Sequence, residues 1–173
     1  KEEMIAFQVG MASLKDRQVH LKSVALNHQG GWYKSVLNNF PYSLTNAQQK
    51  VVEEIKNDIS RTAPMMRLVQ GDVGSGKTIV AAIAAAQSID NNAQVAFMAP
   101  TTLLAEQHFI NLQSYFPDYK DSIALLTGST KAKEKAKIKN GLKSGSIKLV
   151  IGTHALFQDD VSFLLLGLIV IDE

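Results

Sequence analysis

The sequence predicts an α/β fold in which a parallel β-sheet carries helices on both faces. Three observations support this prediction. Several short segments are apolar at nearly every position, which is typical of strands buried on both sides. Segments with helical spacing of apolar residues separate them, and a glycine-rich loop stands between one expected strand and the following helix. Strands that alternate with helices in this way form parallel sheets.

Length and composition limit the alternatives. A chain of 173 residues fits one domain with an appendage. With 46% hydrophobic and 20% charged residues, it should bury a packed core. The formal net charge of +2 means that any nucleic-acid site must be a local patch. The sequence has no cysteine, which excludes disulfides, thiol catalysis and cysteine-ligated metals.

No segment is expected to cross a membrane. The longest apolar runs, at about 79–86 and 163–171, are far shorter than the roughly 20 residues that span a bilayer. The charged first residues are not followed by the apolar core of a secretory signal. We therefore expect a cytoplasmic protein.

Residues 1–40 are predicted to form a helical connector. Apolar residues recur at helical spacing between about 2 and 26, and breaks follow at Gly30 and at 38–41. An isolated amphipathic helix needs something to pack against. We expect Trp32 to help anchor the connector to the domain that follows.

The main domain is expected to occupy residues 41–173. Thr45 and Gln48 fit a capping box that opens a helix with Ile55 and Ile59 on its apolar face. The further expected elements are strands at 65–70, 95–99, 123–126, 148–151 and 168–171, and helices at 78–88, 103–115 and 131–142.

The segment 71–78 fits the pattern G-x-x-x-x-G-K-[ST] of a phosphate-binding loop. Glycines let the backbone aim its N–H groups at phosphate oxygens, and the helix N-terminus adds a positive dipole end. Lys77 supplies a charge for the β- and γ-phosphates, and the Thr78 hydroxyl is a ligand for Mg²⁺. The expected nucleotide contacts in the loop are Gly71, Asp72, Val73, Gly74, Ser75, Gly76, Lys77 and Thr78.

Two carboxylates follow the last expected strand. Asp172 is expected to hold Mg²⁺, and Glu173 to polarise the attacking water. The alternative is a pair of surface acids at the end of a strand. A sheet strand rarely ends a native chain at its functional tip. We therefore expect this chain to be a fragment of a longer protein, with its domain incomplete at the C-terminal side.

Five segments in order resemble the motifs of superfamily 2 helicases, and among them the RecG family of bacterial branch-migrating DNA helicases. They are 41–48, 64–71, 99–108, 126–129 and 152–158. The transcription-repair coupling translocases usually carry a bulky aromatic residue where this chain has Ser75, which favours RecG. Thr102 departs from the glutamate common in that family, so this position carries a hydroxyl in place of a carboxylate.

The resemblance implies the first RecA-like motor domain of an ATP-dependent DNA helicase. ATP and Mg²⁺ would drive movement on branched or duplex DNA in fork reversal, recombination and repair. A second motor domain, which supplies an arginine finger, and a DNA-reading wedge domain would belong to the same full-length chain. Gln48 would read adenine, although its capping role alone also explains it.

The resemblance also implies a DNA-facing set on the motor domain. Each member has an alternative interpretation as a turn or cap residue. The set comprises Pro100, Thr101, Gly128, Ser129, Thr153 and His154.

Several other interpretations stay open or unfavoured at this stage. The lysines between 131 and 139 fit a solvated helix better than a DNA stripe, and His108 is interpreted as structural. Another superfamily 2 translocase is the nearest alternative function. A non-motor nucleotide-binding module would favour an Asn-Lys-x-Asp motif, which the sequence lacks, and a P-loop kinase lid is hard to build from three arginines.

Overall fold

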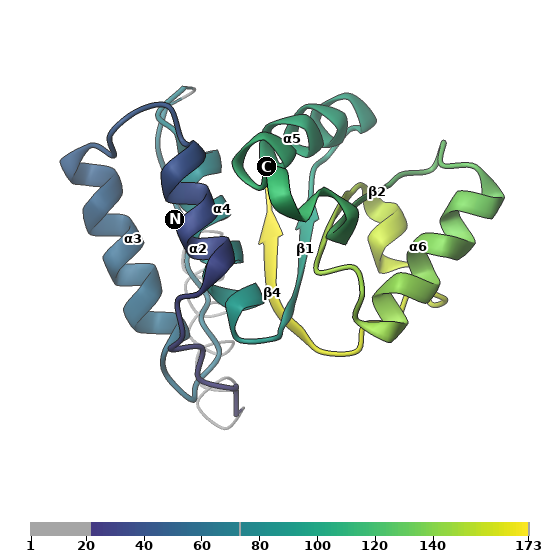
Figure 1. Ribbon diagram of the computed structural model, residues 1–173, viewed down its shortest axis with the longest axis horizontal. Helices are drawn as coiled ribbons and strands as arrows, with labels where there is room; N and C mark the ends of the chain where they lie inside the picture. Colours follow the sequence, from purple (N-terminus) through teal and green to yellow (C-terminus); the bar gives the residue numbers. More distant parts are fainter. Residues whose placement is uncertain (1–21, 73, 173) are drawn as a thin grey trace, which may run out of the picture.

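The computed structural model describes residues 22–72 and 74–172 (Figure 1). Most of the helix expected between about 2 and 26, the loop residue Val73 and the terminal Glu173 lie outside the described residues. Within the described part no helix is long and apolar enough to span a bilayer.

The centre of the molecule is a four-stranded parallel sheet, as predicted. Its strands are β1 (Gln94–Met98), β2 (Ile123–Leu126), β3 (Leu149–Gly152) and β4 (Leu166–Ile171), in the spatial order β2-β3-β1-β4. Val95 of β1 is paired with Leu149 on one side and with Leu168 on the other. All four strands lie within two residues of their expected positions.

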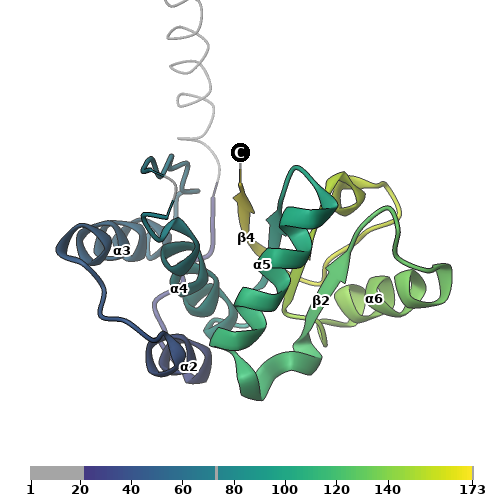
Figure 2. The ribbon, with the colours of Figure 1, turned by 90° about the horizontal axis from the view of Figure 1, so that it is seen from above.

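Helices cover both faces of this sheet. Alternate residues of β1 show the division, because Val95 and Phe97 belong to the larger core and Ala96 to a smaller core with α6. Helices α2 (Gly31–Asn39), α4 (Lys77–Asp90) and α5 (Thr102–Tyr115) pack into the larger core, whereas α6 (Ala132–Ser144) covers the opposite face. Figure 2 shows α6 beyond β2, away from α4. The chain also forms α3 (Asn46–Ile59) and the 3₁₀ helices η1 (Pro117–Ser122) and η2 (His154–Phe157).

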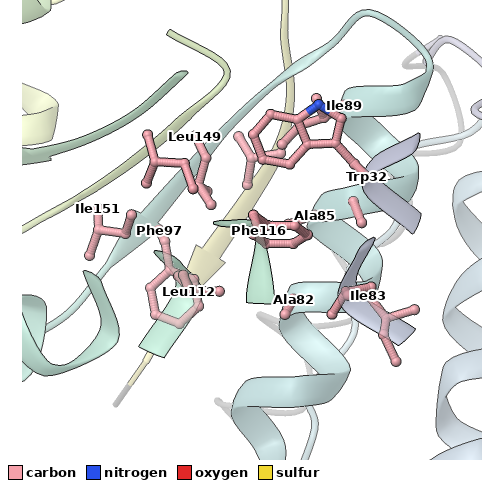
Figure 3. Packing of buried hydrophobic residues seen from close by; sticks show 14 of the residues in the cluster. Trp32, Ala82, Ile83, Ala85, Ile89, Phe97, Leu112, Phe116, Leu149 and Ile151 are labelled. Carbon is pink, nitrogen blue, oxygen red and sulfur yellow. The ribbon is translucent and has the colours of Figure 1, made fainter. Parts of the chain in front are cut away.

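The larger core explains how α4 is held (Figure 3). Ala82 and Ala85 are fully buried, and their small side chains let α4 lie close to the sheet. Trp32 of α2 is 7% exposed and stacks on Tyr119 with ring centroids 4.3 Å apart. It therefore anchors the end of the expected connector, as predicted.

The sequence does not predict α2 itself, because two consecutive glycines, Gly30 and Gly31, indicate a break. Gly31 instead begins the helix, and Gly30 is its N-cap without a side-chain cap. The capping box at Thr45 is confirmed, with Gln48 completing it at the start of α3.

The expected strand at 65–70 is wrong, because no described residue of this segment belongs to the sheet. Leu68 is 88% exposed, and the segment is separated from β4 by a cavity of about 180 Å³ that both line. The guanidinium of Arg67 lies 2.6 Å from carboxylates of Glu54 and Asp58 on α3. These ion pairs hold the segment against α3 instead of against the sheet. Its apolar composition, on which the strand prediction rests, does not reveal them.

Candidate nucleotide-binding site

The backbone of the glycine-rich loop requires two of its glycines. Gly74 and Gly76 both have φ of +81°, a region that other residues adopt only under strain. Gly76 is the N-cap of α4, and a Cβ at this position would collide with the side-chain amide of Gln48. The loop therefore turns sharply into the N-terminus of α4, where N–H groups without helical partners suit an anion.

Lys77 lies over this loop. Its Nζ donates hydrogen bonds to the backbone carbonyls of Gly71, at 2.7 Å, and Asp72, at 3.0 Å. These carbonyls hold the ammonium group at the start of the loop, close to where a bound phosphate would need a positive charge. The expected roles of the loop residues stay predictions, and the geometry of Lys77 supports them.

Gln48 joins the start of α3 to the loop. Its Oε1 accepts from the backbone N–H of Thr45 at 2.9 Å, and its Nε2 donates to the carbonyl of Ser75 at 2.8 Å. The capping interpretation is thus confirmed, and the amide has a second partner in the phosphate loop. Adenine reading by Gln48 stays a prediction.

Asp172 follows β4 at the carboxyl end of the sheet. Its backbone N–H donates to the Met98 carbonyl at 2.9 Å, which extends the pairing of β4 with β1 by one residue. Asp172 lines, together with Lys77 and Thr78, both the 180 Å³ cavity and a second cavity of about 310 Å³. The fold therefore brings the two expected metal ligands to one place, and Glu173 lies outside the described residues.

These side chains fit Mg²⁺ by their chemistry. A hydroxyl and a carboxylate are hard oxygen donors, and Mg²⁺ bound with a nucleotide needs only one or two of them beside phosphates and water. Among residues 22–72 and 74–172, no group of three or more His, Asp or Glu residues could hold a metal by itself. The described side chains thus favour a metal that arrives with phosphate.

The sequence-based interpretation of His108 missed a contact at this site. His108 Nε2 lies 2.6 Å from Asp172 Oδ2, across 64 positions of sequence. The residue is only 9% exposed, and its ring contacts Phe97 with centroids 4.8 Å apart. The only sequence signal was its place two turns into the helix that follows β1, and that spacing does not identify a partner.

The predicted DNA-facing residues lie directly after β1, β2 and β3, in loops except for His154, which begins η2. Because these strands are parallel, the three segments share the carboxyl end of the sheet with Asp172. The phosphate loop reaches the same place, since it lines one cavity with Asp172. All of the predicted DNA-facing residues are exposed except Thr153, which is half-buried. Thr101 also caps α5 by accepting from the Leu104 N–H at 3.2 Å, so its capping interpretation holds, and DNA contact stays a prediction for the whole set.

Two ionisable groups border the cavities. Hydrogen bonding to Asp58, opposed in part by desolvation, raises the pKa of Arg67 above its ordinary value. Arg67 is thus a permanent cation already paired with carboxylates, and it offers little free charge to a phosphate. Burial raises the pKa of Tyr115, which lines the 310 Å³ cavity, so this phenol stays neutral at physiological pH.

Comparison with known proteins identifies the family. Residues 45–173 match the model of the DEAD/DEAH box helicases. The chain is 43% identical to the ATP-dependent DNA helicase RecG of Haemophilus influenzae over 99% of its length and 25% of that protein. It is 43% identical to the Thermotoga maritima RecG over 99% of this chain and 22% of that protein.

A solved structure of RecG bound to a three-way DNA junction superposes with a TM-score of 0.88 at 42% identity. The match covers 99% of this chain and 24% of the solved one, so the chain spans about a quarter of the length of such relatives. These similarities confirm the P-loop, RecA-like fold and the resemblance to RecG. The chain belongs to the DEAD/DEAH box helicase family.

Proposed function

We propose that the chain is the ATP-binding first motor domain of an ATP-dependent DNA helicase that acts on branched or duplex DNA. One observation carries the proposal. The strand order β2-β3-β1-β4 brings the segments after β1, β2 and β3 and Asp172 to one end of the sheet. Asp172 in turn lines a cavity of about 310 Å³ together with Lys77 and Thr78 of the phosphate loop. Nucleotide chemistry at this end of the sheet could then alter the DNA contacts there.

The described residues divide the nucleotide chemistry among them. Backbone N–H groups of the loop and the start of α4 would hold the phosphates, and Lys77 would exchange its two carbonyl partners for phosphate oxygens. Thr78 and Asp172 would hold Mg²⁺, which when bound neutralises phosphate charge. Glu173, the last residue of the sequence, would orient and polarise the attacking water.

The DNA contacts are proposed to be independent of sequence. Short hydroxyl groups and loop N–H groups, as at Thr101 and Ser129, suit phosphate oxygens of the backbone rather than base edges. Such contacts fit an enzyme that must move along DNA of any sequence, in replication fork reversal, recombination and repair.

The organisation of the whole protein is part of the proposal. Residues 1–40 would form a helical connector and 41–173 most of the first motor domain. A second motor domain and a DNA-reading wedge domain would lie elsewhere in a longer chain, in line with the quarter length that is matched in relatives. A helicase of this kind would work in the bacterial cytoplasm, where the chromosome lies.

Nucleotide binding by the chain tests the proposal. We expect calorimetric titration to show modest binding of Mg²⁺–ADP, because half of the nucleotide cleft would belong to the second motor domain. Lys77→Ala should weaken binding, whereas Lys143→Ala, at an exposed lysine near the end of α6, should not. Equal binding by all three proteins would contradict the assignment of the phosphate loop.

A further inference from the structure

The pairing of His108 with Asp172 has no role in the function proposed so far. It joins α5, whose N-cap is the predicted DNA contact Thr101, to the carboxylate predicted to hold Mg²⁺. The pair is also short, at 2.6 Å between Nε2 and Oδ2. A hydrogen bond to an ionised carboxylate is shorter and stronger than one between neutral groups.

The surroundings of the ring define which nitrogen carries the proton. Nδ1 of His108 is buried and has no hydrogen-bond partner among the described residues. A buried N–H without an acceptor costs more than a lone pair left against apolar atoms, so the neutral ring places its proton on Nε2. His108 therefore donates to Asp172, and its contact with Phe97 fixes the plane of the ring.

The other contacts of Asp172 leave one oxygen free for a metal. The backbone is held by the Met98 carbonyl, and Oδ2 is held by His108. Within the described residues no hydrogen bond involves Oδ1, and Asp172 lines the same two cavities as Lys77 and Thr78. One oxygen is thus fixed by the protein while the other can face a cation beside the phosphate loop.

We propose that His108 is a positioning residue that orients the Asp172 carboxylate for Mg²⁺ bound with the nucleotide. The inference rests on the proposed function, because it assigns Asp172 to that metal. Hydrogen-bonding partners of metal ligands typically contribute about 10–100-fold to metal affinity. His108 should therefore affect the part of nucleotide binding that depends on Mg²⁺, and not the part that depends on the phosphate loop.

The test compares ADP binding in EDTA with binding in Mg²⁺ for four versions of the 173-residue chain. We expect Mg²⁺ to tighten binding to the wild type, and His108→Ala to reduce that tightening by about 10-fold or more while binding in EDTA stays unchanged. His108→Gln, which keeps a side-chain N–H donor, should restore much of it. Gln107→Ala, at the exposed neighbour on the same helix, should behave as wild type.

A spectroscopic measurement on the wild type adds a readout that needs no variant to fold. In ¹⁵N NMR of the imidazole rings, Mg²⁺–ADP should shift the His108 signals relative to ADP alone, and the exposed His28 should not respond. ADP binding that Lys77→Ala leaves unchanged would overturn the proposed function together with this inference. Lys77-dependent binding with an equal Mg²⁺ effect in wild type and His108→Ala, or an unshifted His108 signal, would overturn the inference alone.

Discussion

At the scale of single residues, Gln48 shows how one side chain can serve both the fold and the site. Its carbonyl oxygen completes the capping box of α3, and its amide nitrogen ties that helix to Ser75 of the phosphate loop. An amide can both donate to and accept from an adenine edge, so base reading would require Gln48 to exchange one of these partners. Capping and recognition therefore compete for the same atoms.

Replacing Gln48 with alanine should separate these roles. We expect the wild type to prefer ATP over GTP in competition with a fluorescent ADP analogue, and Gln48→Ala to erase that preference. Loss of its part in the cap should also lower the free energy of unfolding by about 0.5–2 kcal/mol, measured by urea denaturation. The matched control is Gln49→Ala, on the same helix, which removes a hydrogen bond from the Gln49 side chain to the carbonyl of Leu44 before the helix. If the wild type showed no preference for ATP over GTP, Gln48 would serve only to cap α3 and to hydrogen-bond the phosphate loop.

At the scale of elements, the last residue of α4 holds the first turn of α2. The carboxylate of Asp90 accepts from the N–H groups of Gly30, Trp32 and Tyr33 at 2.6, 3.1 and 2.9 Å. A negative charge is unfavourable at the C-terminus of its own helix and favourable at the N-terminus of another. Thus α4 begins at the phosphate loop, and its last residue, Asp90, holds α2 at the end of the expected connector.

Asp90→Ala should release this contact. Three N–H groups would lose their acceptor, and we expect the free energy of unfolding to fall by about 1–3 kcal/mol. Trp32 is the only tryptophan of the chain, so its fluorescence reports directly on whether α2 stays packed. Asp159→Ala, at an exposed carboxylate beyond η2, should change neither quantity. Unchanged stability and fluorescence in Asp90→Ala would show that packing of Trp32 suffices to hold α2.

The elements also show what the sequence could and could not predict. The sequence predicts β1 to β3 because strands buried on both faces are apolar throughout, and α3 because its capping box lies within four residues. β4 is apolar as well, so the same pattern predicts it although most of its residues are exposed or half-buried. The segment 65–70 is similarly apolar, so the sequence predicts a strand there too. The acids that pair with Arg67, Asp58 and Glu54, lie 9 and 13 positions away, so the local pattern does not reveal these ion pairs. Asp172 lies 64 positions from its partner His108, and Asp90 lies 58 positions from Trp32, whose N–H donates to it. No local sequence pattern indicates contacts over such separations.

At the scale of the whole molecule, the expected functional residues gather at one end of the sheet, and the strand β4 lies at its exposed edge. Asp172 and the predicted DNA contacts follow strands at its carboxyl end, and the phosphate loop lines a cavity with Asp172 there. β4 pairs with β1 on one side only among the described strands, and its Ile169 and Ile171 are 48% and 62% exposed. This exposed apolar surface agrees with a motor domain that works against further parts of a longer protein.

The last prediction concerns hydrolysis. An arginine finger contributes about 10³–10⁵ in rate to P-loop NTPases, and the proposed finger belongs to a second motor domain. The 173-residue chain should therefore hydrolyse ATP near the background rate even with branched DNA present, because the charge that develops on the γ-phosphate lacks that cation. A longer chain that includes the second motor domain should recover DNA-stimulated phosphate release, and Glu173→Gln in it should stop turnover while ATP still binds. Strong DNA-stimulated release by the 173-residue chain, absent in Lys77→Ala, would show instead that the catalytic groups are complete within this sequence.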